Sequence, residues 1–303
     1  MGTGPVPIFK GSSGLVNTLD PLRVPWNPET GIMGLAAAVN VVIDDSGMVS
    51  RRDGFSEVDS GSWHSVFCDR GPCVAVKGDT LYLIAEDLSL TSLRSGLSRR
   101  LSFAQANDDL YYTSLDGFGI VSNGVHKDWI AEPYVGPDTN RTFTPPYPAE
   151  HVAFWNGRIW LAMDNYIVCS EPFGWSWFDL HGSSILMDSR VRMLKPAQQG
   201  MFISSSRQVY FLSGNSPEDY NLKLVDDVPA LEHSAAVGFV DGIEMGMEFP
   251  GLVVFWVSEK GPVLGSSGGF TVQLSKDRVV YPETAPIGAS LLRGYNLVHT
   301  MGV

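Results

Sequence analysis

Pairs of adjacent carboxylates are the residues of this chain best suited to acid–base chemistry. They occur at Asp44-Asp45, Glu86-Asp87, Asp108-Asp109 and Asp226-Asp227. A glycosidase needs two carboxyl groups that face each other about 5–10 Å apart across a pocket. Neighbouring residues of a strand point to opposite faces, so no adjacent pair forms such a site by itself. We expect most of these acids to stabilise turns, and a pair assembled from separate parts of the fold remains the enzymatic alternative.

The histidines and cysteines show no pattern typical of a metal site or a nucleophile. The chain has no Gly-x-Ser-x-Gly, His-Glu-x-x-His or Walker motif, and no calcium loop of the Asp-x-Asp-x-Asp-Gly type. Cys68, Cys73 and Cys169 are an odd number without a Cys-x-x-Cys pair, which favours free, mostly buried thiols over a redox disulfide or a metal site. The six histidines are isolated in sequence, at positions 64, 126, 151, 181, 233 and 299. We therefore expect no catalytic residue, no cofactor and no metal.

Aromatic residues are concentrated between positions 173 and 178. The segment Phe173-Gly-Trp-Ser-Trp-Phe178 places four rings in six residues. In an exposed loop, Trp175 and Trp177 would form a contact surface or a platform on which sugars stack. In a strand between two layers, the same rings would be core. We name both tryptophans as candidate interaction residues and keep the core interpretation as the alternative.

Charge and hydropathy exclude several classes of function. The 303 residues include 33 acids and 21 bases, which gives a net charge of −12 and opposes binding to duplex DNA. An acidic conduit through which DNA passes without sticking remains compatible, as does an acidic surface that only maintains solubility. No apolar run approaches the roughly 18 residues of a membrane span, and the first residues lack the pattern of a signal peptide. We expect no membrane insertion and assembly in a cytoplasm.

The first 37 residues differ in composition from the rest of the chain. They are rich in glycine and carry prolines at positions 5, 7, 21, 25 and 28. Proline fixes φ and removes a backbone donor, so residues 1–37 are expected to be an extended arm that lies on a neighbouring surface or subunit. A loosely ordered N-terminus is the alternative. The candidate contact residues of the arm are Phe9, Leu15, Leu19, Pro21, Leu22 and Trp26.

Residues 38–303 read as an all-β domain built from one repeated unit. Each unit is an alternating apolar run, a tight turn and a second alternating run. The turns at residues 78, 107, 156, 199, 250 and 294 are 29, 49, 43, 51 and 44 residues apart. Four spacings are close to the roughly 40–50 residues of a four-stranded propeller blade, and the short one suggests a reduced blade. The pattern predicts a β-propeller of about six blades, with five or seven blades or a two-domain sandwich as alternatives.

Both ends of this domain are too short to form a complete blade. The first hairpin spans residues 39–52, around the turn Asp44-Asp45-Ser46-Gly47, and the last strands run from 290 to 303. A propeller avoids exposed sheet edges when strands from both termini share one blade. We therefore expect the N- and C-terminal strands to complete one blade and close the ring.

The order of motifs at the N-terminus resembles that of β-propeller proteins from tailed-bacteriophage virions. The motifs are Gly-Leu-Val-Asn-Thr-Leu-Asp-Pro at 14–21, Ala-Val-Asn-Val at 38–41, the Asp-Ser-Gly turn at 45–47 and Arg-Arg-Asp-Gly-Phe at 51–55. Segments 190–218 and 256–272 are similar to the fourth and fifth blades of those proteins. The resemblance spans most of the chain, and its motifs describe turns and strands.

The resemblance implies a structural, non-enzymatic protein of the phage tail or neck, of the nozzle or hub type. Its copies would form a ring on the DNA ejection path, with six as one expected number, after assembly in the host cytoplasm. Neighbours would be connector or adaptor, tail and fibre proteins, and DNA would be only passing cargo. The alternative from a different class is a propeller that binds or cleaves carbohydrate at the host surface.

Overall fold

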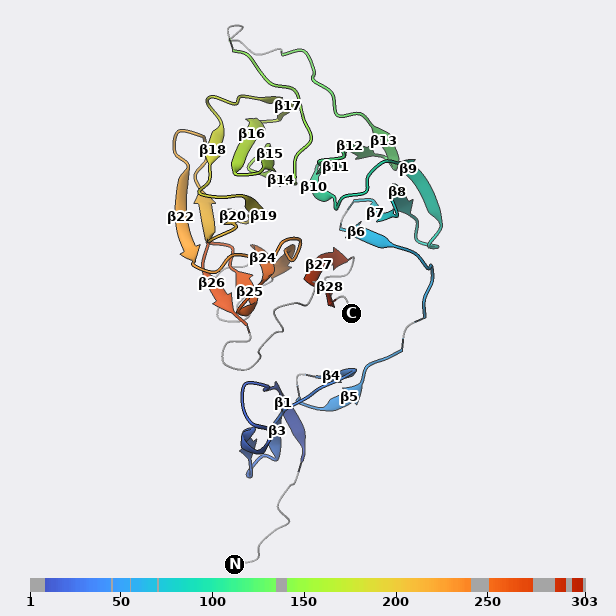
Figure 1. The fold of residues 1–303 in the computed structure, drawn as a ribbon, viewed down its shortest axis with the longest axis vertical. Helices are drawn as coiled ribbons and strands as arrows, with labels where there is room; N and C mark the ends of the chain where they lie inside the picture. Colours follow the sequence, from blue (N-terminus) through green and yellow to red (C-terminus); the bar gives the residue numbers. More distant parts are fainter. Residues whose placement is uncertain are drawn as a thin grey trace, which may run out of the picture.

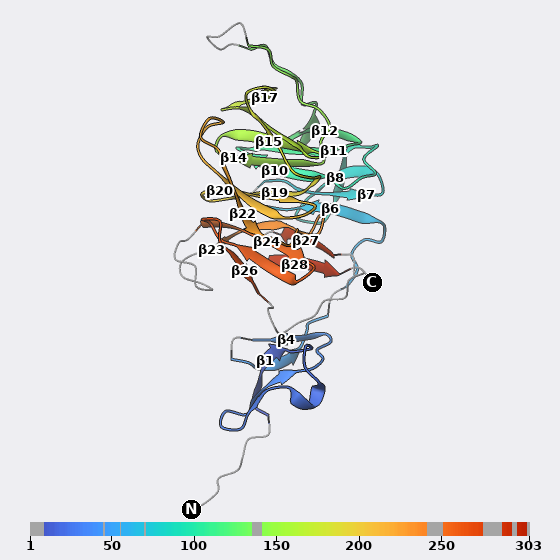
Figure 2. The ribbon, with the colours of Figure 1, turned by 60° about the vertical axis from the view of Figure 1, so that its left-hand side comes forward.

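The computed structural model describes residues 9–44, 46–54, 56–69, 71–134, 141–240, 251–274, 287–292 and 296–301. From Trp63 onward the chain forms successive antiparallel sheets, and Figures 1 and 2 show these sheets around a common centre. The fold is an all-β propeller, as the repeat predicted. No helix within these ranges is long and apolar enough to cross a membrane.

Each of the first four blades is a meander whose strands pair in chain order. The first blade consists of β6 (Trp63–Phe67), β7 (Cys73–Lys77), β8 (Thr80–Ile84) and β9 (Leu90–Arg94). The second has β10 (Ser102–Ala106), β11 (Asp109–Ser114), β12 (Gly117–Ser122) and β13 (Val125–Lys127). The third has β14 (His151–Trp155), β15 (Arg158–Met163), β16 (Tyr166–Glu171) and β17 (Gly174–Phe178), while β18 (Ser184–Leu186) also pairs with β16. The fourth has β19 (Val191–Ala197), β20 (Gly200–Ser205), β21 (Val209–Ser213) and β22 (Asn221–Asp226).

The fifth blade and a shorter sheet complete the described ring. The fifth blade has β23 (Ala236–Val240), β24 (Gly251–Ser258), β25 (Gly261–Gly265) and β26 (Thr271–Gln273). A two-stranded sheet of β27 (Ile287–Leu292) and β28 (Asn296–Met301) follows, and β27 contacts both β23 and β6. The described strands from β6 to β28 thus form six sheets, in agreement with the expected number of blades.

Apolar side chains fill the spaces between adjacent blades. Val76, Leu81 and Tyr112 belong to a buried cluster shared by the first and second blades. Equivalent clusters centre on Leu161 between the second and third blades and on Trp160 between the third and fourth. Phe202 and Trp256, with ring centroids 5.3 Å apart, join the fourth and fifth blades. Both faces of the second, third and fourth blades are therefore covered, which explains why both faces of their strands carry apolar residues.

The turns fix the register of the blades and explain the one irregular spacing. Asn156 and Gly157 both have positive φ, 52° and 70°, as a two-residue hairpin of type I′ requires. The turns at 107, 156 and 199 each join the first and second strands of a blade, whereas Gly78 joins the second and third strands of the first blade. The expectation of a reduced blade was therefore wrong, because the turn at 78 occupies a different place in a complete four-stranded sheet. The turns at 250 and 294 lie outside the described residues.

The segment expected to be an extended arm contains a small folded sheet. β1 (Gly11–Leu15) pairs in parallel with β3 (Ile32–Leu35), which pairs with β2 (Trp26–Asn27), and a 3₁₀ turn, η1 (Pro21–Arg23), lies between them. The prolines do not prevent pairing, because the carbonyl of Pro25 accepts a hydrogen bond of 2.9 Å from the amide of Gly34. Phe9 and the described residues up to 35 therefore lie in or beside a sheet, which corrects the expectation for this part of residues 1–37.

The N-terminal hairpin is a separate two-stranded sheet that contacts this small sheet and does not join the ring. β4 (Val41–Ile43) pairs only with β5 (Val49–Arg51) among the described strands, and the amide of Ser12 in β1 bonds the carbonyl of Gly47. We call β1 to β5, residues 11–51, the N-terminal module, and Figures 1 and 2 show it at one end of the propeller. We expected strands from both termini to share one blade. Instead, β27 and β28 form the closing sheet, and no described N-terminal strand pairs with them.

Candidate functional site

The inner strands of the propeller enclose a cavity of about 320 Å³. Its wall includes residues of β6, β10, β14, β19 and β23, the first strand of each four-stranded blade. Because side chains alternate along a strand, each inner strand can present some residues to this cavity and others to the core between blades. A volume of this size matches the small end of pockets that hold small molecules.

The described wall of the cavity is rich in basic side chains. The titratable residues that line it are Asp69, Arg100, His151, Arg192, Lys195 and His233. Two arginines and one lysine thus face one carboxylate, although the whole chain carries a net charge of −12. An acidic channel wall, which the composition left open, is not what the described residues provide.

Lys195 is the least compensated of these cations. Its side chain takes part in no ion pair or hydrogen bond within the described part of the chain. Burial lowers the pKa of its ammonium group from 10.5 to about 8, because the charged form loses hydration without gaining a partner. The lysine is therefore largely charged at neutral pH at a cost in stability.

His151 faces the same cavity from the neighbouring blade in its neutral form. Burial lowers its pKa to about 4, and repulsion from His233 and Lys195 acts in the same direction. Its Nε2 lies 3.2 Å from the carbonyl oxygen of Val191, so the neutral ring donates its proton to that oxygen. The mutual repulsion among these groups indicates that successive blades direct their basic side chains toward one region.

A compensated cation lies beside the cavity. Arg190 donates from Nη2 to Glu150 at 2.7 Å and to Glu232 at 2.9 Å. Glu232 in turn is 3.9 Å from Nε2 of His233. Two carboxylates thus neutralise Arg190, which does not line the cavity, whereas no such pairs form for the arginines that do.

In three of the four adjacent acidic pairs, one acid stabilises a turn, as predicted. Oδ1 of Asp44 accepts hydrogen bonds of 2.9 Å from the amides of Ser46 and Met48. Asp87 and Asp226 accept equivalent bonds from amides two residues further on. Asp69 is the single carboxylate of the described cavity wall, so these ranges bring no facing carboxylate pair to the ring centre. No cluster of three or more metal-ligating His, Cys, Asp or Glu residues occurs in the described ranges either.

Trp175 and Trp177, predicted as candidate contacts, pack within the protein. Trp175 lies edge-on to Tyr111 of the second blade and to Phe154, with centroids 5.8 and 5.6 Å away, and its Nε1 donates to the carbonyl of Gly157 at 3.0 Å. Trp177 packs edge-on against Tyr134 at 5.0 Å and donates to the carbonyl of Glu132 at 2.8 Å. Both rings are half-buried and fasten the second and third blades and their connection, so they are neither an exposed platform nor fully buried core.

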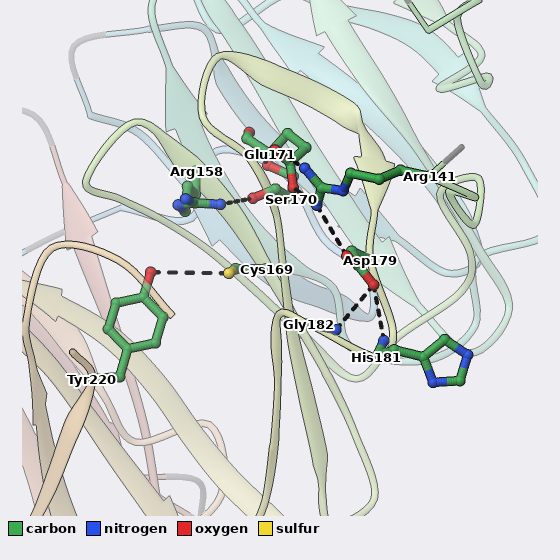
Figure 3. A network of polar contacts seen from close by, with 9 residues as sticks. All are labelled: Arg141, Arg158, Cys169, Ser170, Glu171, Asp179, His181, Gly182 and Tyr220. Carbon is green, nitrogen blue, oxygen red and sulfur yellow. Dashed lines mark hydrogen bonds and ion pairs between the residues drawn. The ribbon is translucent and has the colours of Figure 1, made fainter. Parts of the chain in front are cut away.

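A polar network holds the same connection on the outside of the third blade. Arg141 donates to both oxygens of Glu171, at 3.1 and 2.6 Å, and to Asp179 at 2.9 Å (Figure 3). The amides of His181 and Gly182 also donate to Asp179. The figure shows Arg158 directed to the Ser170 carbonyl, and Cys169 lies near Tyr220. These groups satisfy one another, so we assign them a structural role.

The predicted contact residues of the N-terminal segment are mostly exposed. Leu22 is 96% exposed, and Phe9, Leu19, Pro21 and Trp26 are also classed as exposed, whereas Leu15 is partly buried. Val39, Val42 and Met48 add further exposed apolar side chains in or beside the hairpin. The module thus presents large apolar groups to solvent that its own small sheet does not cover.

The sequence analysis missed the basic cavity. A signal for it is present, because a basic residue lies at or just before the first strand in four successive repeats: Arg100, His151, Arg192 and His233. Recognising it requires the repeats to be aligned by their first strands, and the four basic residues lie at slightly different positions relative to those strands.

Comparisons with known proteins find solved structures with a similar backbone fold but do not assign the chain to a family. No protein-family model and no curated protein match the chain. Among solved structures, the gluconolactonase XC5397 from Xanthomonas campestris is 13% identical, with 79% of this chain and 83% of that one covered and a TM-score of 0.46. BBS1N in complex with ARL6DN is 13% identical over 86% and 83% of the chains, with a TM-score of 0.49. The extracellular domain of the putative hybrid two-component system BT4673 from B. thetaiotaomicron is 10% identical over 84% and 33%, with a TM-score of 0.48. Similarities at this level say nothing about what this chain binds or catalyses.

Proposed function

We propose that this chain is a structural, non-enzymatic component of a tailed-bacteriophage virion, a tail or neck propeller that docks through its N-terminal module. The observation that carries the docking part is the set of exposed apolar side chains on that module, above all Leu22. Exposed apolar groups of this size in a small sheet are typical of a surface that another protein covers. The order of N-terminal motifs supports the assignment to a virion.

The partner in this proposal is a second copy of the same chain. The module lies at one end of the propeller (Figure 2), so it can reach a neighbouring copy without disturbing its own blades. If the contact is head-to-tail and the rotation closes, such copies form a ring. DNA would pass through the ring of copies and not through one propeller, since the cavity of about 320 Å³ has the volume of a small ligand.

A carbohydrate-directed propeller receives no specific support from the site. That function requires exposed Trp175 or Trp177 beside paired carboxylates, and both rings instead pack against neighbouring blades. Glycan-array binding and release of reducing sugar by the purified protein would nevertheless replace the structural proposal with this one.

The test of the proposed function uses the intact chain in two measurements. Light scattering on the purified protein is expected to show closed oligomers at micromolar concentration, and labelled antibody is expected to mark the tail or neck of purified particles. A monomer at all concentrations that is also missing from the particles would contradict the proposal.

A further inference from the structure

Basic side chains from four successive blades meet in the central cavity. Arg100 precedes β10, His151 belongs to β14, Arg192 and Lys195 belong to β19, and His233 precedes β23. These positions are far apart in sequence, and the ring brings them to one wall. Nothing in the proposed docking function uses them.

Within the described part of the chain, the arginines and the lysine of the wall have no carboxylate partner. Two other arginines of the described chain have carboxylate partners: Arg141 with Glu171 and Asp179, and Arg190 with Glu150 and Glu232. No ion pair within the described ranges includes Arg100, Arg192 or Lys195. Arg192 and Lys195 are partly buried, whereas Arg100 is exposed. Holding unpaired charge away from water costs free energy, so an anion in the cavity would stabilise Arg192 and Lys195 most.

We propose that the central cavity binds a small oxyanion of the phosphate class, held by Arg100, Arg192 and Lys195. The guanidinium fork matches the geometry of a phosphate oxygen pair, and the ammonium group adds a compact charge. A volume of about 320 Å³ admits phosphate or a small phosphate monoester and is too small for a folded macromolecule. Asp69, the one carboxylate on the wall, leaves an excess of positive charge there.

The remaining groups around Lys195 are consistent with an anion as the missing partner. His151 and His233 both repel its ammonium group when protonated, and Glu232 is already engaged by Arg190. The uncharged part of the wall, which includes Phe103, Val152 and Met193, cannot stabilise a cation. An oxyanion is thus the occupant whose charge this wall complements.

The test is calorimetric titration of the intact protein with sodium phosphate at pH 7, with ionic strength held constant by sodium chloride. We expect saturable binding of one phosphate per chain. Lys195→Gln and Arg192→Gln should each weaken binding about tenfold or more, because each removes a charged hydrogen bond of the site. Lys223→Gln is the matched control, since Lys223 is exposed on the outer strand β22 and should leave binding unchanged.

Circular dichroism of each variant verifies that it is folded before titration. A parallel titration with glycerol 3-phosphate distinguishes the two sources: tighter binding than phosphate indicates a phosphate monoester, and equal or weaker binding indicates the free ion. Absence of saturable binding by the unmodified protein would overturn the proposal. Equal weakening by Lys223→Gln and Lys195→Gln would also overturn it, because the binding would then be a general effect of surface charge.

Discussion

The amide of Ser12 donates a 2.6 Å hydrogen bond to the carbonyl oxygen of Gly47. This bond joins β1 to the turn region of the β4–β5 hairpin, between residues 35 positions apart in the sequence. The two backbones are so close that a Cβ atom on Gly11 would lie 2.7 Å from the same oxygen. The described strands β1 to β5 therefore form one unit, which can present its exposed apolar side chains in a fixed arrangement.

Replacing Gly47 should loosen this unit and leave the propeller intact. Gly47 has φ of +83°, and a Cβ there would lie 2.9 Å from the carbonyl oxygen of Ser12. Gly47→Ala should therefore destabilise the N-terminal module by about 1–3 kcal/mol. Hydrogen exchange should become faster in β1, β4 and β5 and stay unchanged in the blades. Gly54→Ala is the control, because no atom lies within 4 Å of its Cβ position, and equal effects of both variants would contradict the assignment.

An acidic side chain at Leu22 should prevent association without unfolding the chain. Because Leu22 is 96% exposed, Leu22→Asp should change the free energy of unfolding of the monomer by no more than about 0.5 kcal/mol. In light scattering, the variant should be monomeric where the unmodified protein is oligomeric. Leu186→Asp makes the same change at a 73% exposed position on the propeller and should leave the oligomer intact. Oligomers that persist in Leu22→Asp would exclude this residue from the interface.

Replacing Trp175 should destabilise the fold strongly, because its ring packs against two neighbouring blades. Its ring contacts Tyr111 and Phe154 and donates to Gly157, so Trp175→Ala should cost about 3–5 kcal/mol. Phe173→Ala, two residues earlier and 80% exposed, should cost less than about 0.5 kcal/mol. Urea unfolding of both variants measures the difference, and a cost below 1 kcal/mol for Trp175→Ala would show that the ring is a surface contact.

Asp179 should contribute stability that depends on its ionised form. Burial raises its pKa, but the amide of Gly182 and the guanidinium of Arg141 outweigh burial, and the pKa falls below the ordinary value of 3.8. A carboxyl group whose pKa is lower in the folded state stabilises the fold above its unfolded pKa and loses that contribution as the pH falls through its folded pKa.

Asp179→Asn should therefore cost about 1 kcal/mol at pH 7, and the difference from the unmodified protein should shrink below about pH 4. Urea unfolding at several pH values measures this difference. Asp188→Asn, at an exposed position outside every described ion pair, should show no such dependence. A constant difference between Asp179→Asn and the unmodified protein from pH 7 to pH 3 would contradict the linkage.

Lys195 should lower stability at neutral pH in phosphate-free buffer. The pKa of its ammonium group is about 8 in the folded protein and 10.5 when exposed. Between pH 8 and pH 10.5 the unfolded chain therefore binds more protons than the folded one, so the free energy of unfolding rises with pH. Lys195→Met should raise the free energy of unfolding at pH 7 by about 1–3 kcal/mol and remove this rise. Lys223→Met should do neither, and an identical pH profile for Lys195→Met and the unmodified protein would show that the ammonium group is hydrated.

Local patterns in the sequence were sufficient to predict the strands and turns of the blades. Asn156-Gly157 specifies a hairpin through two positive φ values, and the alternating runs on either side become β14 and β15. Trp160 and Leu161, adjacent in β15, lie in two different buried clusters, so this strand is covered on both faces, which the alternating runs did not predict. The turn at Gly78 was assigned to the wrong position in its blade, because a turn carries no information about which pair of strands it joins.

Contacts between distant segments could not be predicted in the same way. The parallel pairing of Gly11 with Ile32 has no local signature, and the prolines of this segment suggested an unpaired arm. The packing of Trp177 on Tyr134 likewise depends on where a long connection returns. The basic cavity is the clearest case, since His151 and Lys195 become neighbours only when the blades close into a ring.

The most direct test of the proposed role is cryo-electron microscopy of purified virions that carry this chain, reconstructed without imposed symmetry. The account predicts a ring of propellers at the neck or tail, with density for the N-terminal module, and for Leu22 within it, against the adjacent copy. Particles without the chain, or propellers whose N-terminal modules face solvent, would contradict it.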